Sequence, residues 1–154
     1  MKHFPFLFAI ICATAIQSGC TKKQGIENKQ LTEAIQGTWE LREMSGGMMP
    51  GSDKYQPGNG NLLKFTASRY ERYENGVLKQ SGEYVVVKDN SVSESVCLQF
   101  GEGRFANRII YDKSSNGRKT FLELQTGEHA APALNFVTGC YAVDSGSLSK
   151  YEKQ

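Results

Sequence analysis

Turn-forming residues interrupt this chain at short intervals, and they limit the length of every element that it can form. Glycine accounts for 16 of the 154 residues. The clearest turn signals stand at Gly46-Gly47, Asn75-Gly76, Gly101 to Gly103, Asn116-Gly117 and Asp144 to Gly146. Short apolar stretches separated by Gly, Asn and Ser are typical of antiparallel β proteins. The spacing therefore predicts many short strands and no long helix.

The expected strands follow from these intervals. They lie near Thr38 to Met44, Asn61 to Thr66, Arg69 to Glu74, Val77 to Lys88, Ser95 to Phe100, Phe105 to Tyr111, Lys119 to Gln125, Ala133 to Val137 and Leu148 to Glu152. One helical turn is expected before the first strand, because Leu31 and Ile35 stand four residues apart and Thr32 offers a cap. The glycine- and proline-rich segment from Gly46 to Gly60 is expected to be a long mobile loop.

Strands at hairpin spacing can pack as a two-sheet sandwich or close into a barrel. The helical turn directly before the first strand favours the barrel. We therefore expect an all-β domain over residues 31–154, an antiparallel up-and-down β-barrel of about eight strands with a short N-terminal helical turn.

The first nineteen residues have the layout of an export signal. Met1-Lys2-His3 gives a positive start, and the apolar run from Phe4 to Ile16 is shorter than the ~20 residues that a membrane-spanning helix needs. The small residues before Cys20 resemble the lipobox of bacterial lipoproteins, with Gln17 where leucine is usual. That resemblance implies cleavage after residue 19 and a diacylglycerol on Cys20. An ordinary cleaved signal followed by a free cysteine is the alternative.

A lipid on Cys20 places the protein in the bacterial cell envelope, most often on the outer membrane, facing the periplasm or the cell surface. Residues 20–30 then comprise the lipidated cysteine and a polar stretch with one aliphatic residue. Such a stretch cannot bury enough apolar surface to fold alone, and it is expected to be a flexible tether.

Two further cysteines, Cys97 and Cys140, remain in the exported part of the chain. An even number of cysteines in an oxidising compartment favours a disulfide. A bond between them closes a loop of about 43 residues and stabilises the fold by ~4 kcal/mol on the chain-entropy model. Two buried thiols, or a reactive thiol with His129 as its base, are the alternatives.

The exported chain resembles the lipocalin-like domains of bacterial lipoproteins. Gly37-Thr38-Trp39 follows the helical turn and matches the Gly-x-Trp motif that opens the first strand of lipocalins. The run from Gly76 to Tyr84, the turn from Gly139 to Gly146 and the closing Tyr151 extend the similarity over nearly all of the exported chain.

This resemblance implies a structural role for Trp39, the only tryptophan in the chain. In the family, the ring plugs the closed end of the barrel and a basic residue near the last strand packs over it. Here the last strand offers Lys150 and Lys153 in place of an arginine, and an ammonium is a poorer match to the ring than a planar guanidinium.

Asn75-Gly76 is the strongest hairpin signal, because a type I′ turn needs two residues that tolerate positive φ. A two-residue turn pairs Glu74 with Val77, Tyr73 with Leu78, Glu71 with Gln80 and Arg69 with Gly82. One face of the hairpin then carries the candidate ligand-binding residues Arg69, Glu71, Tyr73, Gln80 and Tyr84. An apolar floor below a polar mouth is the usual arrangement of a small-ligand pocket. Alternatively, this end of the hairpin projects beyond the rim and both faces are wet.

Charge and motifs exclude several classes of function. Removing Lys2 with the leader leaves 17 basic against 16 acidic residues, which is too balanced for nucleic-acid binding through phosphates. The exported chain has one histidine, His129, and no Cys-x-x-Cys, so we expect no metal and no cofactor. Asp144 has no Gly-x-Ser-x-Gly nucleophile to serve, and Glu71, Glu74 and Glu83 alternate with basic residues as on a solvated strand. We therefore expect no enzyme.

Two functions remain from the sequence. The first is a membrane-anchored barrel that holds a small, partly apolar ligand in the cell envelope. The second is a filled barrel without a ligand, which contacts another envelope protein through the segment from Gly46 to Gly60 or through the hairpin end at Asn75.

Overall fold

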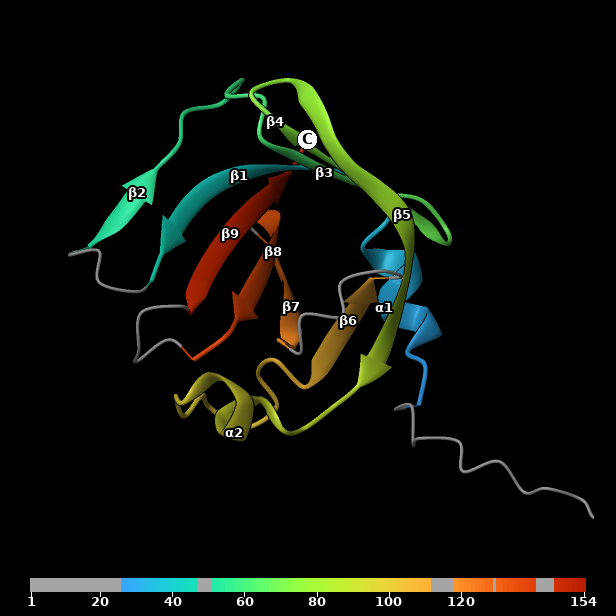
Figure 1. Cartoon of the computed structure of the whole chain (residues 1–154), viewed down its shortest axis with the longest axis vertical. Helices are drawn as coiled ribbons and strands as arrows, with labels where there is room; N and C mark the ends of the chain where they lie inside the picture. The colour runs from blue at the N-terminus through green and yellow to red at the C-terminus, as the bar shows by residue number, and fades with distance from the viewer. Residues whose placement is uncertain (1–25, 47–50, 112–117, 129, 141–145) are drawn as a thin grey trace, which may run out of the picture.

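Eight strands form a closed antiparallel barrel (Figure 1). The computed structural model describes residues 26–46, 51–111, 118–128, 130–140 and 146–154. The barrel strands are β1 (Gly37–Ser45), β3 (Leu62–Phe65), β4 (Arg69–Glu74), β5 (Val77–Lys88), β6 (Asn107–Tyr111), β7 (Thr120–Gly127), β8 (Ala130–Thr138) and β9 (Ser147–Lys153). Each pairs antiparallel with its neighbour, and β9 pairs with β1 to close the ring. The predicted fold class is confirmed.

The remaining strand, β2 (Ser52–Lys54), shares one edge of β1 with β3. β3 pairs with the first half of β1, from Gly37 to Glu40, and β2 pairs with its last three residues. The prediction of a single long loop from Gly46 to Gly60 is therefore wrong for residues 52–54. Residues 47–50 lie outside the described part of the chain.

The predicted helical turn is confirmed as α1 (Lys29–Ala34), with a different cap. Asn28 is the cap, and its Oδ1 accepts a hydrogen bond from the backbone N–H of Leu31 at 3.1 Å. Thr32 lies inside the helix, where its hydroxyl donates to the carbonyl of Asn28. No helix among the described residues is long and apolar enough to cross a bilayer.

The ordered domain begins before the predicted boundary at Leu31. Glu27 forms an isolated bridge with Val87 of β5, and the N–H of Asn28 donates to the carbonyl of Val86 at 2.8 Å. Residues 26–30 therefore belong to the folded domain, so the predicted tether is too long at this end. The backbone bonds to β5 supply the order that the polar side chains cannot.

The expected strand from Ser95 to Phe100 is wrong, because residues 95 and 96 belong to a helix, α2 (Val92–Val96), and residues 97–100 form no strand. Val92 and Val96 stand four residues apart and pack on one side of the helix against Phe121 of β7 and Val137 of β8. Phe121 alternates with Leu122 of the barrel core, so it points outward. The helix thus covers the outside of the barrel wall and forms a second apolar cluster there.

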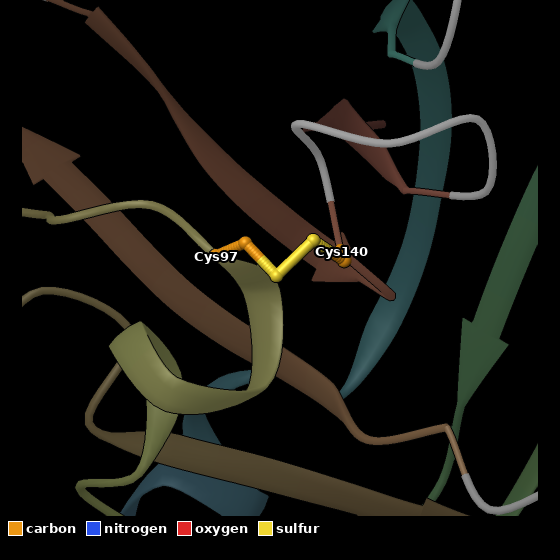
Figure 2. The surroundings of a disulfide bond; sticks show 2 residues. All are labelled: Cys97 and Cys140. Carbon is orange, nitrogen blue, oxygen red and sulfur yellow. A yellow bond between two sulfur atoms is a disulfide. The ribbon is translucent and has the colours of Figure 1, made fainter.

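A disulfide joins this outer helix to the barrel, as predicted. Cys97, directly after α2, is bonded to Cys140 in the connection that follows β8 (Figure 2). The two residues are 43 positions apart in the sequence. The bond therefore fixes the end of α2, a helix that packs only against the outside of the barrel wall.

Trp39 fills the end of the barrel that α1 covers. The ring is fully buried beside Ile35, the residue that ends α1, and its Nε1–H donates to the Ile35 carbonyl at 2.7 Å. Of the two lysines in the last strand, Lys153 takes the place over the ring, with Nζ 5.4 Å from the centroid. Gly37 has φ +123°, and a Cβ there would lie 3.1 Å from Lys153 Cε. Glycine at this position leaves room for the lysine side chain.

Candidate functional site: the barrel cavity

The register of the β4–β5 hairpin decides which side chains face the barrel interior. The turn is as predicted, since Asn75 and Gly76 have φ of +51° and +77° and Glu74 pairs with Val77. Beyond Tyr73 and Leu78, however, the register shifts and Lys79 is left without a partner, so Arg72 pairs with Gln80. The pairs predicted for Glu71 with Gln80 and Arg69 with Gly82 are therefore wrong. Glu71 faces Ser81 and Arg69 faces Glu83.

This single extra residue changes the face assignment, because side chains alternate across a strand. Arg69, Glu71 and Tyr73 lie on the outside of the barrel, where the Tyr73 hydroxyl donates to Glu71 Oε2 at 2.8 Å. Gln80 and Tyr84 keep the inward direction because they follow the bulge. The predicted set of five is therefore divided between two faces, and its three β4 members do not line the interior.

A cavity of about 420 Å³ opens in the barrel interior. Every one of the eight barrel strands contributes a side chain to its wall. The described lining residues are Met44, Leu63, Tyr70, Arg72, Gln80, Tyr111, Arg118, Thr120, Phe136, Thr138, Ser147, Ser149 and Tyr151. This volume is within the ~300–1,000 Å³ typical of small-ligand pockets.

The lining changes from apolar to polar toward the rim. Leu63, Tyr70 and Phe136 are buried and belong to the barrel core. Half-buried hydroxyls of serine and threonine from β7, β8 and β9 follow on one wall. Arg72 and Gln80, which are exposed, stand on either side of the hairpin near its turn. The expected apolar floor and polar mouth are present, but largely with other residues than those predicted.

Of the five predicted ligand-binding residues, only Gln80 lines this cavity. Tyr84 points inward but lies in the core, where its hydroxyl donates to the Thr66 carbonyl at 2.7 Å. Tyr70 and Arg72 were not predicted to line the cavity, because an uninterrupted register places both on the outer face. Tyr111 and Tyr151 were missed as well, since each lies in a strand for which no pairing was predicted.

Three tyrosines, Tyr70, Tyr111 and Tyr151, line the cavity. The rings of Tyr70 and Tyr111 are 4.4 Å apart between centroids, and Tyr151 meets Phe136 edge to face at 5.8 Å. Burial raises the pKa of Tyr111 and that of Tyr151 above the usual value of a phenol. Both hydroxyls are therefore neutral at physiological pH and can donate hydrogen bonds to a ligand.

The charged groups on the described lining are both positive, Arg72 and Arg118. Arg72 donates from Nη2 to Glu74 Oε1 at 2.7 Å, and both side chains are about half exposed, at 51% and 44%. The positive charge of Arg72 also favours the ionised form of Tyr111 and of Tyr151, against the larger effect of burial on their pKa. The rim of the cavity therefore holds a guanidinium, that of Arg72, whose charge is partly balanced by the Glu74 carboxylate.

Two further hollows of about 410 and 390 Å³ lie beside the helices. One is bordered by α1, the segment before β6, and β7, and in it the Asn28 side chain donates to Asn107 Oδ1 at 2.8 Å. The other lies between α2 and the residues before β6. Neither is lined by all eight barrel strands, as the barrel cavity is, so the barrel cavity is the candidate site for a ligand.

Carboxylates elsewhere on the barrel have structural partners. Glu40 is buried on the outside of β1, with Oε2 2.6 Å from Arg42 Nη1. Burial alone raises its pKa, but hydrogen bonds, led by that from Arg42, outweigh this effect and hold the pKa below the usual value. Glu40 is therefore an ionised member of an ion pair. No group of three metal-ligating side chains occurs among the described residues, and Cys20, His129 and Asp144 lie outside them.

Comparisons with known proteins add no relative. No protein-family model, curated protein or solved structure matches the chain. Similarity to the lipocalin-like lipoproteins thus stays a prediction from the motifs around Trp39 and Gly76. The architecture and the cavity are the observations from which function is argued.

Proposed function

We propose that this protein is a lipid-anchored, lipocalin-like carrier that binds a small, partly apolar ligand in the bacterial cell envelope. The barrel cavity carries the proposal, because its buried floor is apolar and its rim polar. Binding pockets combine these features so that apolar contact gives affinity and a few polar groups fix orientation.

The start of the folded domain determines where a lipid on Cys20 would hold the barrel. Ile26 accepts a backbone hydrogen bond from Lys88, the last residue of β5, at the end of the barrel near α1. Six residue steps separate Cys20 from Ile26 and span at most about 21 Å. The other end of β5 carries the cavity rim, roughly 35 Å along the strand at ~3.3 Å per residue. The anchor therefore holds the α1 end next to the bilayer and the cavity mouth farther from it.

Attachment of lipid can be read from the mass of the mature protein. Material extracted from host membranes is expected to have the mass of residues 20–154 plus acyl groups on Cys20. The variant Cys20→Ala is expected to keep its leader and to lack the acyl mass, because the thiol is the site of alkylation. A wild-type mature chain whose N-terminal Cys20 carries no added mass would contradict the anchor.

Filling the cavity is expected to remove the ligand without unfolding the barrel. Ser149 lines the interior on β9, so the indole of Ser149→Trp occupies space that a ligand would use. Ser81→Trp is the matched control, because Ser81 is exposed and pairs with Glu71 on the outer face. In native mass spectrometry after gentle extraction from the host, wild type and Ser81→Trp are expected to retain a bound small molecule. Ser149→Trp is expected to be empty.

Repeatedly empty wild-type protein would count against a carrier. The alternative is an interaction with another envelope protein, and the exposed side chains of Val77 and Leu78 are where such a protein would bind. These side chains are 57% and 49% exposed at the tip of the β4–β5 hairpin, where apolar residues gain nothing from water.

A further inference from the structure

The polar groups of the cavity specify the charge of its ligand. We propose that the ligand is a single-chain amphiphile whose anionic head group, a carboxylate or a phosphate ester, binds Arg72 at the rim while its chain lies on the apolar floor. This inference rests on the proposed function, since it names the chemistry of the ligand in the same cavity.

Arg72 is placed to hold an anion at the mouth. It lines the cavity from β4, beside its partner Gln80 on β5. Its bond to Glu74 uses Nη2, and a guanidinium has five N–H donors in a planar fork. Because Arg72 and Glu74 are both about half exposed, solvent screens their attraction and little energy is lost when a second oxyanion shares the guanidinium. A head group at the rim can therefore form a charge-assisted bond.

The groups around Arg72 favour an anion over a cation. The charge of Arg72 acts on the pKa of Tyr111 and of Tyr151, and burial keeps both hydroxyls protonated, so that they can donate hydrogen bonds. Arg118 adds a second positive charge to the described lining, and no acidic side chain is part of it. The Glu74 carboxylate is already paired with Arg72, so a cationic head group would have to compete with that guanidinium for it.

The floor and the volume limit the rest of the ligand. Leu63, Phe136 and the ring of Tyr70 form a buried apolar surface below the hydroxyls. At about 30 Å³ for each water-sized group, the cavity has room for roughly fourteen non-hydrogen atoms. One short acyl or alkyl chain with its head group fits this space, and a lipid with two full-length chains does not.

Binding of four probes with the same ten-carbon chain tests the head group. The protein is the mature chain, residues 20–154, with Cys20→Ser, exported with a leader that adds no lipid so that detergent is absent. Calorimetry is expected to show decanoate or decyl phosphate binding at least about ten-fold more tightly than decanol, as one charge-assisted hydrogen bond allows. Decyltrimethylammonium is expected to bind most weakly. The tighter of the two anions distinguishes a carboxylate from a phosphate ligand.

Two arginines on one strand provide the matched variants. Arg72→Gln is expected to weaken binding of the preferred anion about ten-fold and to leave decanol unchanged, because the chain contacts are intact. Arg69→Gln removes the same charge from the outer face of β4 and is expected to change neither. Since the Arg72 side chain is about half exposed and forms a surface ion pair, its replacement leaves the fold intact, which circular dichroism checks.

The outcomes separate this inference from the proposed function. Equal affinity for decanol and both anions, or the same loss from Arg69→Gln as from Arg72→Gln, would overturn the anionic ligand while a carrier remains. Failure of all four probes to bind a protein that retains another molecule from the host would overturn it as well. Empty host-purified protein that also binds no probe would remove the carrier function itself.

Discussion

Trp39→Ala is expected to lower the free energy of unfolding by about 3–5 kcal/mol, the cost typical of removing a large buried aromatic side chain. The indole is fully buried between α1 and the barrel core, so its removal leaves a cavity that the closed ring of strands cannot collapse to fill. The bond from Nε1 to the Ile35 carbonyl and the contact with Lys153 are lost as well. A domain of this size commonly has only about 5–15 kcal/mol in total, so the expected loss is a large fraction of its stability.

Trp39→Phe separates the hydrogen bond from the packing. Phenylalanine keeps most of the ring but leaves the buried Ile35 carbonyl without its donor, which costs about 1–3 kcal/mol. Urea unfolding followed by circular dichroism is the measurement, because both variants lack the only tryptophan fluorophore. The expected order of stability is wild type, then Trp39→Phe, then Trp39→Ala. A loss below about 1 kcal/mol for alanine would show that the ring does not support the barrel end.

Removing the disulfide is expected to cost about 4 kcal/mol, the loop-closure entropy for two residues 43 positions apart. The double variant Cys97→Ser, Cys140→Ser avoids a free thiol, and its unfolding in urea is compared with that of the oxidised wild type. Reduced wild type is the control, since it breaks the same bond with no change of sequence. A double variant as stable as the oxidised protein would contradict the expectation.

Loss of the disulfide is also expected to loosen α2 locally. Apart from the disulfide, α2 is held to the barrel by Val92 and Val96, which pack on the outside of β7 and β8. Hydrogen exchange of the double variant is therefore expected to be faster in residues 92–96, which open locally, than in the strands, which exchange only through the global unfolding that loss of the bond makes more frequent. Equal exchange rates in residues 92–96 and in β7, β8 and β9 would contradict a local opening of α2.

Several features of the fold were predictable because they depend on neighbouring residues or on the number and type of a few side chains. Asn75-Gly76 forms the expected turn, since both residues tolerate the positive φ that a two-residue hairpin requires. Gly37 and Trp39 lie where the motif places them, and the pair of cysteines is bonded. Regular turn signals predicted the antiparallel strands, and the helical turn before the first strand favoured the closed barrel.

The candidate site was much less predictable. The sequence anticipated a cavity with an apolar floor and a polar mouth, and it placed Gln80 there. It placed Arg69 inside and Arg72 outside, which is the reverse of the structure. A strand was predicted from Ser95 to Phe100, yet residues 95 and 96 belong to α2, whose Val92 and Val96 pack on the apolar wall beside Phe121.

By itself, then, the sequence predicted the Asn75-Gly76 turn, the class of fold and the disulfide, and its resemblance to lipocalins predicted that Trp39 fills the end of the barrel. Each prediction rests on backbone preference or on the chemistry of a few side chains. The tertiary structure alone decided which arginine enters the cavity and which side of the wall α2 covers. The physical reason is that side chains alternate between the two faces of a strand. Because Lys79 of β5 has no partner, the β4 residues that pair beyond it lie on the opposite face from the one predicted. The Asn75-Gly76 turn by itself predicts an uninterrupted register, so the bulge became visible only in the pairing of β4 with β5.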